Sequence, residues 1–158
     1  MLRHQCFAPV VDQRTRILIL GSLPGAASLS AGRYYANPRN QFWALVGAAI
    51  GADLVAMAYE DRLTTLLDNR IGLWDVVAEA GREGSLDGSI RDAVANDLGA
   101  LVESLPSLET VAFNGAKAAA IGAPRISRQM RLLRLPSSSP AYTLAFDRKR
   151  VEWMKLAS

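Results

Sequence analysis

The chain has 158 residues and a mass of 17.1 kDa, which is enough for one domain over residues 1–158 and too little for two. Half of the residues are hydrophobic and 21% are charged, as in a packed globular protein and unlike a disordered or fibrous one. Cys6 is the only cysteine and His4 the only histidine, which excludes an internal disulfide and a Cys/His cluster for zinc or iron–sulfur. No metal and no cofactor is therefore expected.

The net charge of +3 is unevenly distributed along the chain. Residues 1–40 carry five basic and one acidic residue, residues 41–116 carry four and twelve, and residues 117–158 carry nine and two. If the two basic ends meet in the fold, they form a positive face suited to phosphates. The alternative is that both ends are simply solvated.

Two segments bear on the cellular setting. The N-terminus lacks the apolar core of a secretory signal, which favours a reducing, cytoplasmic protein. Residues 42–59 are 18 residues long with one charge, Asp53, but Gly47 and Gly51 interrupt them. We expect a buried helix and the start of another there, and no membrane span.

The first half of the chain alternates strand-like and helical patterns. Residues 16–20 are a short run rich in branched apolar residues, which predicts a buried strand, and the loop at 21–25 ends it. Residues 41–51 and 59–69 have helical patterns, and residues 71–77 are strand-like or a buried turn.

The alternation resumes in the second half. In chain order the pattern predicts a long polar loop at 81–92, a helix at 97–105 stopped by Pro106, a strand at 110–113, a helix at 116–121, a strand at 130–135 and a helix at 144–156. Strands that alternate with helices indicate a parallel or mixed sheet covered on both faces. Ligands bind at the carboxyl ends of such strands, where the loops 21–25, 114–115 and 136–140 fall, so these loops predict a single site.

Three segments resemble motifs of the uracil-DNA glycosylase superfamily. GSLPGAASLSAGRYYANPRNQFW (21–43) resembles its first motif, and FNGAKA (113–118) and LPSSSPAY (135–142) are similar to its middle and second motifs, in the same order. YYANPRNQFW looks like the hypoxanthine-DNA glycosylase branch, a relative of the mismatch-specific thymine/uracil branch with its Gly-Ile-Asn-Pro-Gly loop. The resemblance extends from about Arg16 to the C-terminal helix.

The resemblance implies a three-layer α/β/α sandwich around a mostly parallel sheet of four or five strands. It also implies a monofunctional enzyme that flips a deaminated base, hypoxanthine above others, out of double-stranded DNA and hydrolyses its N-glycosidic bond without a cofactor. The alternatives are a uracil or mismatch glycosylase and a non-catalytic nucleic-acid binder on the same fold. The expected protein is a monomer, associated with the nucleoid through DNA, and an abasic-site endonuclease would take over its product.

For catalysis, the resemblance points to Asn40. The loop asparagine of the mismatch branch, which positions the attacking water, is taken as replaced by Ser22, and Asn40 inherits its task. The alternative for Asn40 is a helix cap. No histidine lies near Ser137–Ser139 and no aspartate lies in the 21–25 loop, so the site is expected to work without a strong acid or base.

The resemblance also assigns residues to the base and to the DNA. Tyr35 would stack on the base, and Asn114 would read its edge unless it only shapes an Asn-Gly turn. The first loop would let the backbone approach the base through Gly21, Leu23, Pro24 and Gly25. The expected DNA contacts are Ser137, Ser138, Ser139, Pro140, Ala141, Tyr142, Arg39 and Lys117, with residues 141–144 as a candidate wedge.

The resemblance assigns no site role to a series of arginines or to Asp75. Arg125, Arg128, Arg131 and Arg134 recur at every third position, which suits either phosphate contacts or a solvated face. Asp75, in a segment that also resembles the hypoxanthine branch, is assigned a structural role.

Overall fold

A parallel four-stranded sheet forms the centre of the molecule. The computed structural model describes residues 3–81 and 91–157, so most of the loop predicted at 81–92 lies outside the described residues. The strands follow the order β3-β2-β6-β7, and every neighbouring pair is parallel. Their bounds are Ile17–Gly21 (β2), Ile71–Asp75 (β3), Thr110–Asn114 (β6) and Arg131–Leu135 (β7).

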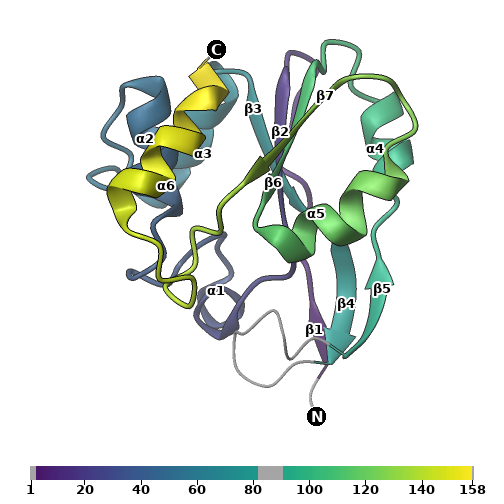
Figure 1. The fold of residues 1–158 in the computed structure, drawn as a ribbon, viewed down its shortest axis with the longest axis horizontal. Helices are drawn as coiled ribbons and strands as arrows, with labels where there is room; N and C mark the ends of the chain where they lie inside the picture. The colour runs from purple at the N-terminus through teal and green to yellow at the C-terminus, as the bar shows by residue number, and fades with distance from the viewer. Residues whose placement is uncertain (1–2, 82–90, 158) are drawn as a thin grey trace.

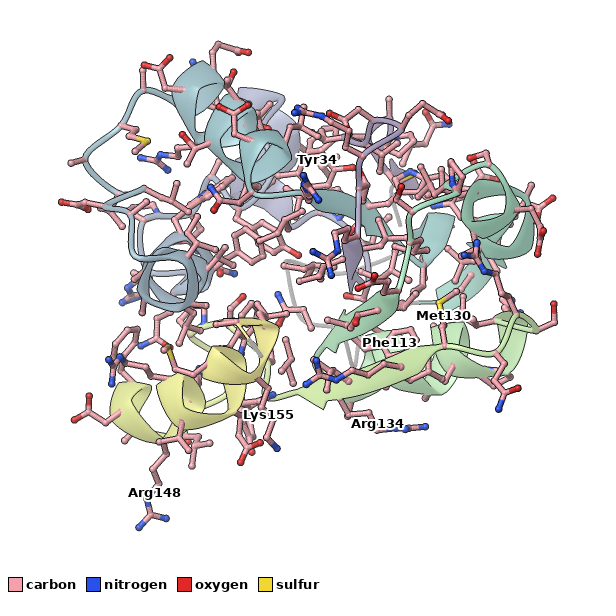
Figure 2. The ribbon with its side chains drawn as sticks, turned by 90° about the horizontal axis from the view of Figure 1, so that it is seen from above. Tyr34, Phe113, Met130, Arg134, Arg148 and Lys155 are labelled. Carbon is pink, nitrogen blue, oxygen red and sulfur yellow. The ribbon has the colours of Figure 1, made fainter. Side chains whose placement is uncertain are left out.

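Helices cover both faces of this sheet (Figure 1). One side carries α2 (Phe42–Ile50), α3 (Tyr59–Asp68) and α6 (Phe146–Trp153); the other carries α4 (Leu98–Glu103) and α5 (Ala116–Gly122). Seen from above, the two helical groups flank the strands, and Arg148 of α6 points away from them (Figure 2). The predicted three-layer α/β/α sandwich is confirmed.

The two layers of core follow from side-chain alternation along β2. Leu18 and Leu20 are fully buried in a cluster with Val102 of α4, whereas Ile19 is fully buried in a second cluster with Trp153 of α6. Successive side chains of a strand point to opposite faces, so a strand that is apolar throughout must be covered on both.

Some elements were not expected from the sequence. A second, antiparallel sheet pairs β1 (Arg3–Gln5), β4 (Val77–Gly81) and β5 (Arg91–Ala95) in the order β1-β4-β5. A short helix, α1 (Ala26–Ala31), follows the first loop. Short 3-10 helices at Ala123–Arg125 and Met154–Ala157 extend α5 and α6, so the predicted helix at 144–156 is shorter and partly 3-10.

The apolar stretch at 42–59 forms α2 and the approach to α3. Phe42, Leu45 and Val46 are fully buried in the core, which confirms the expected buried helix. Within residues 3–81 and 91–157, no helix has the length and apolar character needed to cross a bilayer.

Candidate active site

The carboxyl ends of the sheet strands open into a cleft of about 610 Å³, within the roughly 300–1,000 Å³ of small-molecule sites. The residues assigned above to catalysis and base binding all line it, and so do the individually named DNA contacts except Arg39, which is exposed but not among the lining residues. Most of the lining comes from residues 21–40 and 117–142. Both basic segments of the chain thus contribute backbone and side chains to the cleft, and among its lining residues Lys117 is the one basic side chain.

The first loop is fixed to the end of β3. The backbone oxygens of Gly21 and Ser22 accept from the N–H groups of Val76 (2.8 Å) and Val77 (3.0 Å). Ser22 is 7% exposed and Leu23 6%. Counted from the Pro-Gly pair that both loops share, the asparagine of the mismatch branch falls opposite Leu23 and not Ser22. An apolar side chain can hold no water, so the argument for moving water positioning elsewhere becomes stronger.

Tyr35 is held in the cleft wall by its backbone and by its ring. Its φ of 52° lies in the left-handed region, and its carbonyl accepts from Trp43 Nε1 at 3.2 Å. Its ring stacks on that of Phe42, with centroids 3.8 Å apart and an angle of 11°. One face of the ring is thus covered by Phe42, and a base can stack only on the other.

Asn40 accepts one hydrogen bond at the start of α2 and still keeps free hydrogen-bonding capacity. Its Oδ1 accepts from the N–H of Phe42 at 3.0 Å, at the first residue of α2. Among the described residues, its Nδ2 makes no hydrogen bond, and its Oδ1 has a second lone pair. The N-cap of α2 is Gln41, so Asn40 holds the turn before the helix, and it remains able to accept from a water and to donate to a substrate.

Asn114, at the end of β6, is clamped to the loop that follows β7. Its Oδ1 accepts from the N–H of Ser138 at 2.9 Å, and its Nδ2 donates to Ser138 Oγ at 2.9 Å and to Tyr35 Oη at 3.4 Å. Asn114 is 6% exposed and Ser138 1%. The turn after it is real as well, because Gly115 has a φ of 97°. Asn114 keeps one lone pair for a base, and its long contact with Tyr35 is the one that a base could replace.

The serine loop is ordered from within. Ser137 Oγ accepts from the N–H of Ser139, and Ser139 Oγ accepts from that of Ala141, both at 3.1 Å, which leaves both hydroxyl hydrogens available to phosphates. Ser138 is poorly placed for the phosphate contact expected of it, because its side chain is buried and hydrogen-bonded to Asn114. Tyr142 is 47% exposed at the cleft rim, a position suited to a wedge.

A buried cation lies under this loop. Lys149 of α6 is 1% exposed, its Nζ donates to the Ser139 carbonyl at 3.3 Å, and it lies 5.4 Å from the centroid of the Tyr142 ring. Burial lowers the pKa of Lys149. The sequence pattern gave no sign of it, since a lysine between two arginines on a short helix normally faces solvent.

Asp75 adds to the cleft an acidic side chain that none of the three motif loops carries. It ends β3, is 4% exposed and lines the cleft. Its negative charge is the second cause, after burial, that raises the pKa of Tyr34. From its sequence context Asp75 is assigned only a structural role; it reaches the cleft because β3 pairs with β2, which places Asp75 beside Gly21.

The arginine series does not form one surface. Arg128 donates to the carbonyls of Val102, Leu105 and Leu108, so it ties the end of α4 to the following loop. Arg131 begins β7, at the end of the sheet opposite the cleft. Within the described residues, no three His, Cys, Asp or Glu side chains gather as a metal site.

The fold and the cleft define a class of protein. A family model of the uracil DNA glycosylase superfamily matches residues 8–157, and the chain belongs to this superfamily. It is 46% identical over 147 residues, 93% of each chain, to a Methanosarcina acetivorans protein named hypoxanthine DNA glycosylase. It is 47% identical over 116 residues, 73% of each chain, to a Methanosarcina barkeri protein of the same name. A solution NMR structure of a uracil DNA glycosylase candidate from M. acetivorans superposes with a TM-score of 0.90 at 44% identity, covering 99% of this chain and 97% of that one.

Proposed function

We propose that the protein is a monofunctional DNA glycosylase that flips a deaminated base, hypoxanthine first among them, out of duplex DNA and hydrolyses its N-glycosidic bond. The observation that carries this is the meeting of the three motif segments in one cleft at the strand ends. The names of the two Methanosarcina relatives favour hypoxanthine. The product is an abasic site for an abasic-site endonuclease, and the protein acts on DNA as a cytoplasmic monomer.

The chemistry suits the residues at hand. The bond between N9 and C1′ breaks with its electron pair going to the base, water adds its hydroxyl to C1′, and its proton ends on the base. The sugar carries positive charge in this transition state, so positioned neutral groups contribute several kcal/mol when water is excluded. Asn40 orients the water through the free lone pair of Oδ1, and Tyr35 stacks on the base, a contact worth about 1–3 kcal/mol.

The residues of the cleft rim bind the flanking strand. Ser137 and Ser139 have hydroxyl hydrogens to donate to phosphates, and Lys117 brings a positive charge to the rim. Arg39 contacts DNA from the surface. Tyr142 enters the duplex in place of the flipped nucleotide.

A gel assay tests the proposal. Duplexes that carry hypoxanthine, uracil or thymine opposite each normal base are incubated with the protein and cleaved with alkali. We expect strand scission at hypoxanthine above the other lesions. Scission only at uracil or thymine would replace the substrate, and no scission at any lesion would leave a non-catalytic binder.

Asn40→Ala tests the catalytic assignment. We expect single-turnover excision to fall roughly 100- to 1,000-fold, the usual loss when one positioned polar group is removed from such a site. Loss of the hydrogen bond to the Phe42 N–H costs about 1 kcal/mol, so Asp53→Ala, which removes a similar Oδ1 contact to the N–H of Ala56 at an exposed position, is the control. Equal rates for both variants would move the catalytic task to Ser22 or Asn114.

A further inference from the structure

The proposed reaction leaves Asp75 without a task, although its side chain lines the cleft and is 4% exposed. A carboxyl group at the bottom of a ligand site is costly to bury and does not arise from packing needs. Its position therefore calls for a role toward the ligand.

Asp75 is held rigidly in place. It pairs with Gly21 across β2 and β3, and its carbonyl accepts from Asn96 Nδ2 at 2.7 Å. The next residue, Val76, donates its N–H to Gly21 O at 2.8 Å. A group fixed on both sides can select between ligands by geometry, because it cannot move to suit each one.

Gly21 lets two oxygen atoms converge on the floor of the cleft. A Cβ atom at this position would lie 2.7 Å from Asp75 Oδ1 and 2.8 Å from Tyr35 Oη. Tyr35 Oη in turn accepts from Asn114 Nδ2 at 3.4 Å. The floor thus carries a carboxylate, a phenol and an amide side by side, drawn from three separate segments.

Depth in the cleft separates the base from the sugar. A flipped nucleotide enters base first, while its sugar and phosphates stay attached to the duplex at the mouth. The mouth carries Tyr142, 47% exposed, whereas Asp75 and Asn114 are 4% and 6% exposed. Asp75 therefore faces the edge of the base and not the sugar.

We propose that Asp75 determines specificity by accepting the N1–H of hypoxanthine, while Asn114 Nδ2 donates to O6; this rests on the proposed function. A carboxylate only accepts hydrogen bonds, and hypoxanthine offers a donor at N1. Adenine, from which hypoxanthine arises by deamination, has a lone pair at N1 and a donor at C6. It would meet acceptor with acceptor and donor with donor, so the floor rejects the normal base.

This role concerns selection more than the rate of bond cleavage. The departing base becomes negatively charged, and a nearby carboxylate gives that charge no help. The effect is therefore measured as a ratio between two substrates, hypoxanthine and unsubstituted purine, whose N1 is a bare acceptor.

The experiment compares single-turnover excision efficiencies of both bases for wild type and Asp75→Asn. The amide can turn its NH₂ toward a bare N1, so the hypoxanthine-to-purine ratio should fall roughly 10- to 100-fold, the range for a hydrogen bond to a charged group. Asp68→Asn, an exposed aspartate with 67% side-chain exposure, should keep the wild-type ratio. An unchanged ratio, including equal slowing of both bases, overturns the role of Asp75 while the glycosylase function stands.

Wild-type protein supplies a second measurement in case Asp75→Asn fails to fold. A duplex with 1-methylhypoxanthine, which has no N1–H, should be cleaved at least 10-fold more slowly than one with hypoxanthine. Equal rates would overturn the proposal. A wild type that releases neither base would overturn the proposed function itself.

Discussion

Gly21→Ala should damage the site and the stability together, because its methyl group would enter the floor of the cleft. The added carbon would meet Asp75 Oδ1 at 2.7 Å and Tyr35 Oη at 2.8 Å, against an ordinary contact of 3.4 Å or more. Neither neighbour can yield easily. Asp75 is short and sits on a paired strand, and the Tyr35 ring is stacked at 3.8 Å on Phe42.

The size of the effect follows from this crowding. Overpacking of this kind costs about 1–3 kcal/mol, which for a chain of this length lowers Tm by roughly 2–12 °C. The neighbouring oxygens must retreat by about 0.7 Å, and misplacement near 1 Å reduces turnover by about 100-fold. We therefore expect single-turnover excision of hypoxanthine to fall between 10- and 100-fold, measured beside a thermal melt.

Two variants make the reasoning refutable. Gly99→Ala, in α4, adds a methyl group whose nearest atom lies at an ordinary 3.7 Å, so it should keep activity and stabilise the helix by about 0.5–1 kcal/mol. Gly21→Ala combined with Tyr35→Phe removes one of the two clashes and should recover part of the lost Tm. A Gly21→Ala protein with wild-type Tm and activity would show that the floor is not tightly packed.

Three further predictions concern the surroundings of the cleft. Ser138→Ala removes the acceptor for Asn114 Nδ2, so thermal unfolding should show a loss of about 1–2 kcal/mol; an unchanged Tm would mean that the clamp contributes nothing. Burial lowers the pKa of Lys149 from its ordinary 10.5, so the amine holds its proton more tightly in the unfolded chain than in the folded protein. The free energy of unfolding of wild type, measured by denaturant titration, should therefore rise relative to that of Lys149→Met as the pH increases toward 10.5. A constant difference between pH 8 and 10.5 would contradict this. The pKa of the Cys6 thiol is raised by burial and, to a smaller extent, by the charge of Asp75, while a hydrogen bond from Asn96 lowers it. Thiol labelling of Cys6 should therefore be slow at pH 8 and faster in Asp75→Asn, because removing the charge lowers the pKa. Equal labelling rates in the two proteins would argue against a charged Asp75.

The central sheet could be predicted because its strands are uniformly apolar. A run such as residues 16–20 has no polar face to expose, so only a strand covered on both sides can bury it. The second sheet could not be predicted in this way. Its β1 is Arg3–Gln5, a polar segment that is a strand because its backbone pairs with β4 and not because of its own propensity.

The candidate site could also be predicted only in part. Segments 21–25, 114–115 and 136–140 could be placed together because parallel strands deliver their carboxyl ends to one edge. The partners within that edge could not, since spacing along the chain says nothing of the pairing between Asn114 and Ser138, 24 residues apart. The burial of Lys149 could not be predicted either. Its neighbours in sequence are charged, which predicts a solvent-exposed position, and the loop that contains Ser139 covers it in the fold.

Asp75 shows that the basic and acidic segments of the chain contribute groups with different tasks to the same cleft. The basic C-terminal segment contributes Lys117 to the cleft lining, where it suits a phosphate, and the acidic middle segment contributes a single carboxylate, Asp75. Attraction of DNA depends on the summed charge around the cleft, whereas the choice of base depends on one acceptor at the floor of the cleft. Removing basic residues at the rim should therefore weaken binding to all duplexes alike, and changing Asp75 should alter which base is released.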